Sequence, residues 1–164
     1  MRLEEIYDRY GDKLFHYLTI KLNSANDAED VLQEVFLRFA RYSIRWRLVR
    51  NVEAFVFRAA RNEANRFARR NMKRGVGPRN AAELAATMRE MTEGPDQAAT
   101  EMLTGALARL PEKQREVIVL KIFEGLTFKQ IASVCGLSIN TAASRYRYGL
   151  AGLRSLMEGK DEGT

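Results

Sequence analysis

The chain has 164 residues, of which 46% are hydrophobic and 29% charged, and its net charge is +6 at pH 7. This composition is typical of a globular protein rather than a disordered one. A single cysteine excludes an internal disulfide, and with only one histidine the chain cannot build a zinc site. No apolar run approaches the ~20 residues of a membrane span, and residues 1–5 do not resemble a secretory signal. We therefore expect a cytoplasmic protein without a cofactor and without membrane insertion.

Apolar residues recur at intervals of three and four through the N-terminal half, which predicts three amphipathic helices. The first covers residues 3–22, the second begins after Ser24, and the third begins near Asn51. The apolar stripe of the first helix comprises Leu3, Ile6, Tyr7, Tyr10, Leu14, Tyr17, Leu18 and Leu22. For the third helix we expect the core residues Val52, Phe55, Val56 and Ala59, with Phe67 as a further candidate. No alternating strand pattern occurs, so the predicted fold class is all-α.

The positive charge is concentrated in residues 41–74, which carry 11 basic and 2 acidic side chains. Nearly all of these cations are arginines, whose planar guanidinium groups suit phosphate. An ordinary solvent-facing surface would distribute its basic residues along the whole chain. The concentration therefore favours a polyanionic partner, and nucleic acid in preference to a membrane surface.

Prolines and glycines divide the chain into two lobes. Pro78 and Pro95, each beside a glycine, bracket a stretch with few large apolar residues. We predict a first domain over 1–74, a linker over 75–97, a second domain over 98–158 and a polar tail over 159–164. Each predicted domain is long enough for a small helical core.

A helix-turn-helix pattern occupies residues 126–157. Thr127 and Gln130 have the spacing of a capping box that starts a short helix. Gly136 ends this helix, and Ser138 caps a longer second one. The second helix carries polar side chains that suit base edges and phosphates in a major groove: Asn140, Thr141, Ser144, Arg145, Arg147 and Tyr148. A capped helical hairpin in an ordinary bundle is the alternative interpretation.

Three segments resemble signatures of bacterial RNA polymerase sigma factors. Residues 27–38 (DAEDVLQEVFLR) resemble the segment that binds core polymerase, and residues 55–62 (FVFRAARN) are similar to the helix that binds the minus-ten element. Residues 110–117 (LPEKQREV), followed by 126–145, resemble the promoter-reading C-terminal domain. The segments follow the family's order over nearly all of 1–158 and leave no room for an extra central domain. They therefore resemble the two-domain, extracytoplasmic-function type.

The resemblance implies a transcription initiation factor, with no catalysis of its own, that directs core RNA polymerase to promoter DNA. It assigns core-polymerase binding to one stripe of the second helix, formed by Asp30, Gln33 and Glu34. It assigns the melted, single-stranded minus-ten element to the loop 41–50 and the third helix, through Tyr42, Arg45, Trp46, Arg58, Arg61, Asn62, Asn65 and Arg69. The helix-turn-helix residues named above would read the duplex minus-thirty-five element. An anti-sigma factor is left open as a further partner.

The same residues allow other interpretations. Trp46 either stacks on an unpaired base or fills the core of the first domain. The stripe of the second helix and the polar face of the third either bind partners or face solvent. The whole chain is alternatively interpreted as a stand-alone helix-turn-helix regulator, which would usually bind duplex DNA as a dimer. An enzyme acting on nucleic acid is the weakest interpretation, because the sequence offers no metal cluster and no nucleophile–base pair.

The recognition helix departs from the family at two positions. Members often have Val and Lys where this chain has Ala142 and Ala143. The lost lysine would have contacted a phosphate or a base. We therefore expect weaker or differently specified recognition of the minus-thirty-five element.

Overall fold

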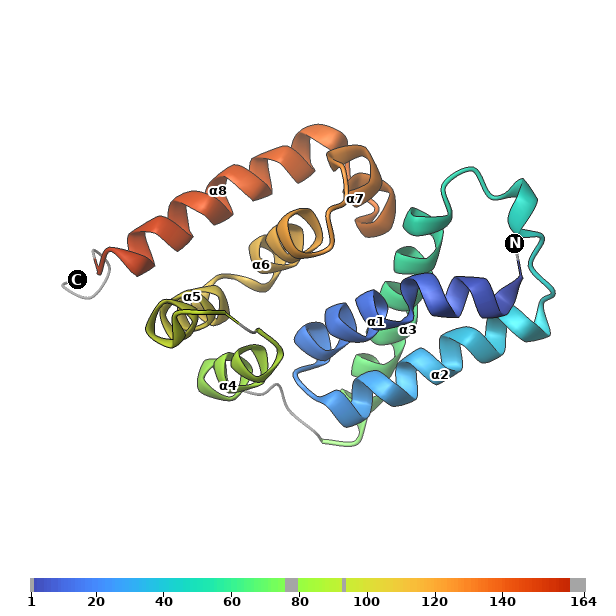
Figure 1. The fold of residues 1–164 in the computed structure, drawn as a ribbon, viewed down its shortest axis with the longest axis horizontal. Coiled ribbons are helices and arrows are strands. Elements are labelled where there is room, and N and C mark those ends of the chain that lie inside the picture. The colour runs from blue at the N-terminus through green and yellow to red at the C-terminus, as the bar shows by residue number, and fades with distance from the viewer. Residues whose placement is uncertain (1, 76–79, 93, 160–164) are drawn as a thin grey trace. The chain divides into compact units, whose positions relative to one another are not determined.

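The computed structural model describes residues 2–75, 80–92 and 94–159 (Figure 1). These residues form helices and connecting turns without a strand, so the all-α prediction is confirmed. They include no helix long and apolar enough to cross a membrane. The chain divides into two compact units, described separately below as the N-terminal unit (α1–α3) and the C-terminal unit (α4–α8). The predicted polar tail lies outside the described residues except for Gly159.

The N-terminal unit is a three-helix bundle of α1 (Leu3–Leu22), α2 (Ala25–Arg41) and α3 (Val52–Lys73), in which each helix contacts the other two. Its core is built around Tyr17 of α1 and Phe57 of α3, both almost completely buried. Their rings meet edge to face with centroids 5.6 Å apart, a favoured aromatic geometry. This contact joins the first helix to the third at the centre of the bundle.

Short polar side chains start α2 and α3. Asn23 ends α1 in the left-handed conformation, with φ at 52°. The Ser24 hydroxyl oxygen then accepts the backbone N–H of Asp27 at 3.1 Å. In the same way, Asn51 Oδ1 accepts the backbone N–H of Ala54 at 2.9 Å. Each cap satisfies a donor that the first turn of a helix leaves without a partner, so both helices start where the sequence predicts.

The buried face of α3 differs in part from the prediction. Val56 is buried as expected, but Phe57, which the prediction left out, lies at the centre of the core. Four residues expected in the core are only half-buried: Val52, Phe55, Ala59 and Phe67. The start of α3 carries apolar residues on two sides, so spacing alone permits more than one buried face. The contact between Phe57 and Tyr17 decides which face packs inward.

Within residues 80–159, the C-terminal unit contains α4 (Ala81–Met91), α5 (Gln97–Arg109), α6 (Glu112–Ile118), α7 (Phe128–Cys135) and α8 (Ile139–Met157). Residues 128–132 of α7 and all of α8 belong to this unit. The helix α6 continues into a π-helical turn at Val119–Phe123. The helix α4 lies inside the predicted linker, yet it packs along α5 and buries Leu84 and Met88. Part of the segment between the predicted domains therefore has a packed position.

The helix-turn-helix forms as the sequence predicts. The Thr127 hydroxyl accepts the Gln130 backbone N–H at 3.1 Å, and Gln130 Oε1 accepts the Thr127 N–H at 2.8 Å. These two bonds complete the capping box of α7. Gly136 takes the left-handed conformation, with φ at 67°, and Ser138 caps α8 through the Thr141 N–H at 3.1 Å. Local hydrogen bonds therefore fix both ends of the turn.

Small residues allow α8 to approach α6 closely. A Cβ atom at Gly149 would lie 2.7 Å from Cδ1 of Ile118, closer than side chains tolerate without moving. Ala142 and Leu153 lie on the same side of α8 and are also buried. The opposite side of the helix consequently faces away from the core of the unit. This close packing presents one polar face of α8 to solvent.

Arg115 joins the end of α5 to α6. Its Nη1 donates to the backbone carbonyls of Ala108 and Leu110 at 3.2 and 3.1 Å. Burial lowers the pKa of Arg115, while the nearby carboxylates of Glu112 and Glu116 act in the opposite direction. The guanidinium stays charged at neutral pH because its ordinary pKa is far higher. Arg115 therefore serves the corner between two helices rather than a binding surface.

Candidate polymerase and nucleic-acid interfaces

The predicted polymerase-binding stripe lies together on α2. Asp30 and Gln33 are exposed, and Glu34 is half-buried. Glu34 Oε1 accepts a hydrogen bond from Nε of Arg38 at 3.4 Å, one turn further along the helix. The stripe therefore presents one amide and two carboxylates, one of which already has an internal cationic partner.

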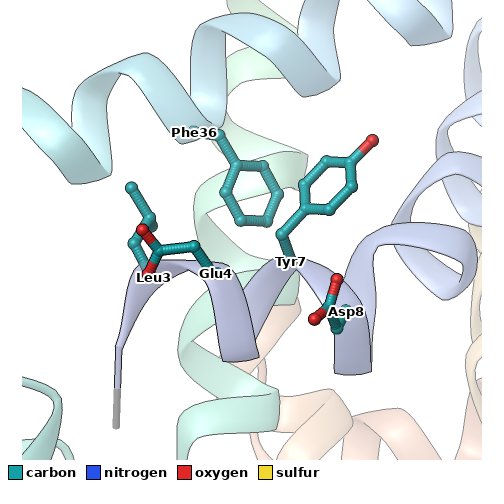
Figure 2. A pocket seen from close by; sticks show the side chains of 5 residues that line it. All are labelled: Leu3, Glu4, Tyr7, Asp8 and Phe36. Carbon is teal, nitrogen blue, oxygen red and sulfur yellow. The ribbon is translucent and has the colours of Figure 1, made fainter.

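An apolar groove of about 490 Å³ lies between α1 and α2 beside this stripe. Its lining residues are Leu3, Tyr7, Glu29, Leu32, Gln33, Phe36, Leu37 and Ala40. Figure 2 shows a second hollow that shares Leu3, Tyr7 and Phe36 with this groove and is completed by Glu4 and Asp8; the rings of Tyr7 and Phe36 lie next to each other in it. The two ring centroids are 5.0 Å apart. Because Gln33 belongs to both, the groove and the stripe form one continuous surface.

Helical spacing along the sequence does not reveal this groove. Tyr7 falls on the apolar stripe expected for the first helix, but its side chain is 54% exposed. Leu37 on α2 is likewise 57% exposed. One feature of the sequence could have indicated the groove: Leu37 is a large apolar residue within an otherwise polar helix face. Exposed apolar residues grouped in this way mark an interaction surface more often than single ones do.

The loop between α2 and α3 exposes part of the predicted minus-ten set. Tyr42 is 68% exposed and Arg45 is also exposed, whereas Trp46 is only 7% exposed. The indole of Trp46 packs edge-on against Phe39 and Phe55, with ring centroids 5.1 and 5.7 Å away. Of the two interpretations of Trp46, the structure favours the core residue. The indole anchors the short 3-10 helix Trp46–Leu48, which contains Arg47 and directly follows Arg45.

The predicted polar face of α3 is present as one surface. Arg58, Asn62 and Arg69 are exposed, and Arg61 and Asn65 are half-buried. Their spacing places all five on the side of α3 opposite the buried Ala60. No acidic side chain belongs to this set of described residues. The face therefore offers amides and guanidinium groups to an anionic partner.

The N-terminal turns of α8 present the predicted minus-thirty-five residues. Asn140, Thr141, Arg147 and Tyr148 are exposed, and Ser144 and Arg145 are half-buried. Arg147 Nη2 donates to the Ser144 hydroxyl at 3.2 Å. Ala142, by contrast, is fully buried, so this position packs inside the unit. Ala143 is half-buried and is the position where a lysine would have reached solvent.

Comparison with known proteins gives matches in both units. The family model described as Sigma-70 region 2 matches residues 6–74, and the model described as Sigma-70, region 4 matches residues 100–151. The RNA polymerase sigma factor SigZ of Bacillus subtilis (strain 168) is 27% identical over 159 residues, which cover 97% of this chain and 89% of SigZ. The ferric citrate uptake sigma factor FecI of Escherichia coli (strain K12) is 31% identical over 147 residues, covering 86% of this chain and 82% of FecI.

A solved structure shares the fold. It is the co-crystal structure of the sigma factor RpoE in complex with the anti-sigma factor NepR from Bartonella quintana. The TM-score is 0.71 at 21% identity, over 94% of this chain and 96% of RpoE. The matches follow one another in the order of the two units, and they agree with the family that the sequence motifs resemble. The chain therefore belongs to the sigma-70 family of RNA polymerase sigma factors and is of the extracytoplasmic-function type.

Proposed function

We propose that this sigma factor binds core RNA polymerase in the cytoplasm and directs it to promoter DNA, reading the minus-ten element with its N-terminal unit and the minus-thirty-five element with its C-terminal unit. One observation carries the proposal. Each unit matched by a sigma-70 region presents one polar, arginine-bearing helix face, on α3 and on α8 respectively. Such faces suit phosphates and base edges.

Core polymerase would bind the stripe of Asp30, Gln33 and Glu34 together with the apolar groove beside it. The exposed rings and aliphatic side chains of the groove would become buried when the partner binds. The carboxylates would favour a partner with a basic surface. The related RpoE was solved in complex with the anti-sigma factor NepR. An anti-sigma protein that covers the same stripe and groove would keep this chain from polymerase.

The minus-ten element would bind as a melted single strand across the loop 41–50 and the polar face of α3. Tyr42 is the exposed ring on which a base can stack, and Arg45 would follow the phosphates. Asn62 and Asn65, which lie between the arginines of α3, would form hydrogen bonds with base edges. Trp46 belongs to the site as the support of its loop, since stacking on a base would require the indole to leave Phe39 and Phe55.

The minus-thirty-five element would bind as duplex DNA. The capped start of α8 would enter the major groove with Asn140 and Thr141 toward base edges, as in other helix-turn-helix proteins. Arg145 and Arg147 would contact the backbone, and Tyr148 lies beside them on the exposed side. Sequence selection would therefore depend mainly on the first turn and a half of the helix.

Titration of the labelled full-length chain into core RNA polymerase, followed by fluorescence anisotropy, tests the proposal. We expect stoichiometric binding. The double substitution Asp30→Lys, Glu34→Lys should weaken it at least tenfold, equivalent to about 1.4 kcal/mol, because two lysines then repel a basic partner. The control Asp12→Lys, Glu5→Lys changes as much charge on exposed positions of α1. Binding to duplex DNA without binding to polymerase would instead indicate a stand-alone regulator.

A further inference from the structure

We propose that the last turns of α3 form a phosphate-binding site for the backbone of duplex DNA, and that the buried Glu63 is the residue that positions it. The cations of this site are Arg66, Arg69, Arg70 and Lys73. The proposal rests on the proposed function, because it extends the DNA surface of α3 beyond the residues that the sequence motifs assign. Only Arg69 belongs to both sets.

Glu63 is a charged residue in the core of the N-terminal unit. Its side chain is 3% exposed, and a buried carboxylate costs free energy unless cations compensate it. Arg66 Nη1 lies 3.5 Å from Oε2 of Glu63, and Arg70 Nη2 lies 3.6 Å from Oε1. Arg38 of α2 contributes a third guanidinium, with Nε 3.4 Å from Oε2. One buried carboxylate thus gathers three arginines from two helices.

Arg66 and Arg70 keep much of their surface in solvent while they contact Glu63. Their side chains are 44% and 60% exposed. A guanidinium group carries five N–H donors in a planar fork, so one edge can face a carboxylate while another binds a phosphate oxygen. Glu63 therefore restricts the motion of two long side chains without occupying all of their donors.

The exposed edges of these arginines line a surface hollow of about 480 Å³. The hollow is bounded by Arg66, Arg69, Arg70, Met72 and Lys73. Its lining holds four cations and no acidic side chain. Arg69 joins it to the polar face of α3 that carries Arg58 and Asn62. The lining itself contains cations but no amide and no aromatic ring, and it therefore suits the sugar–phosphate backbone rather than base edges.

Removal of the Glu63 charge has two opposing effects on DNA binding. A lost negative charge strengthens the attraction to phosphate, but the three arginines in contact with Glu63 already offset much of that charge. A lost partner frees two rotamer-rich side chains, which DNA must then immobilise. We expect the second effect to dominate, because the arginines are long and the carboxylate lies beneath them in the core. The Glu63→Gln variant should therefore bind duplex DNA about tenfold more weakly.

Salt dependence of binding identifies the phosphate contacts. The full-length chain is titrated into a fluorescein-labelled duplex of about 30 base pairs, whose sequence is arbitrary because backbone contacts do not read bases. The slope of log K against log salt should become shallower by about 2 in the double variant Arg66→Gln, Arg70→Gln, at about 0.9 per phosphate contact. The control Arg2→Gln, Arg9→Gln removes the same charge from exposed positions outside the site and should keep the wild-type slope. An unchanged slope in the first variant, or no measurable duplex binding by the wild type at low salt, overturns the proposal.

A double-mutant comparison tests the role of Glu63 itself. Glu63→Gln should weaken DNA binding in the wild type and add nothing once Arg66 and Arg70 are both glutamine, since a positioning residue acts through them. Equal losses in both backgrounds indicate a purely structural role and contradict the proposal, as does tighter binding by Glu63→Gln. Circular dichroism checks the fold. Should the amide variant not fold, Glu63→Leu takes its place, because apolar replacement of a buried ion pair often preserves stability.

Two further measurements separate the possible failures. Core-polymerase binding would use the stripe and groove of α1 and α2, so it should be unchanged in the Arg66→Gln, Arg70→Gln variant, which keeps Arg38 between Glu34 and Glu63. Its absence in the wild type contradicts the proposed function, whereas an unchanged salt slope contradicts the phosphate site alone. Inorganic phosphate should displace the duplex no more strongly than chloride does at the same ionic strength. Stronger displacement would show a site for free anions instead of DNA and would overturn the assignment.

Discussion

The two helices that we propose as DNA-binding elements, α3 and α8, are held by different kinds of interaction. In the C-terminal unit, α8 is placed by local hydrogen-bonded caps and by small residues that meet α6 at van der Waals distance. In the N-terminal unit, α3 and the loop before it depend on a buried indole and a buried carboxylate whose partners lie on α2 and on α3 itself. The first arrangement tolerates changes of charge but not of volume. The second depends on particular aromatic and charged groups.

The largest expected effect is the loss of the indole. Trp46→Ala should lower the free energy of unfolding of the N-terminal unit by about 3–5 kcal/mol, because it leaves a cavity beside Phe39 and Phe55. Urea denaturation followed by circular dichroism measures the loss. Tyr42→Ala is the matched control: it should leave stability unchanged and weaken binding to a single-stranded minus-ten oligonucleotide by about 1–3 kcal/mol. Equal stability of Trp46→Ala and the wild type would contradict the buried position of Trp46.

A volume change tests the C-terminal unit. Gly149→Val should lower its stability by about 1–3 kcal/mol, since the new side chain meets the buried Ile118. Gly105→Ala in α5 is the control, because a Cβ there meets nothing within 4 Å, and it should raise stability by about 0.5–1 kcal/mol. Thermal unfolding measures both variants: the melting temperature should fall in Gly149→Val and rise in Gly105→Ala. A neutral Gly149→Val would mean that α8 is not closely packed on α6.

The smallest expected effect comes from the capping box. Thr127→Ala removes the hydroxyl that accepts the Gln130 N–H and should cost about 1 kcal/mol. The exposed Lys129 lies in the same helical turn, and Lys129→Ala should change stability by no more than a few tenths of a kcal/mol. Denaturant midpoints of the two variants provide the comparison. If both behave alike, the turn is held by packing of Leu126 and Ile131 rather than by its hydrogen bonds.

The predictable parts of the molecule are those that local rules determine. The capping residues of α2, α3, α7 and α8 act within three residues of the helix start, so the sequence reveals them directly. The exposure of Asn140 and Arg147 follows from the same helix start and its periodicity. The caps and the exposure of these two side chains each follow from residue spacing along a single helix.

The parts that the sequence did not reveal depend on contacts between helices. Phe55 and Phe57 are equally apolar, and only the position of Tyr17 on α1 decides that Phe57 takes the centre of the core. Glu63 lies in a strongly basic segment and is expected at the surface from its charge alone. Its burial becomes explicable once Arg38, 25 positions earlier in the numbering, is seen beside it. The groove at Tyr7 is likewise created by two helices together.

The burial of Trp46 gives the protein an internal spectroscopic reporter. The chain contains one tryptophan, so its emission under selective excitation comes from a single place in the N-terminal unit. An indole packed between two phenylalanine rings emits at shorter wavelength than one in water. A red shift upon addition of single-stranded DNA would therefore show the loop opening, without any attached dye. The C-terminal unit contains no tryptophan, so the signal reports on the N-terminal unit alone.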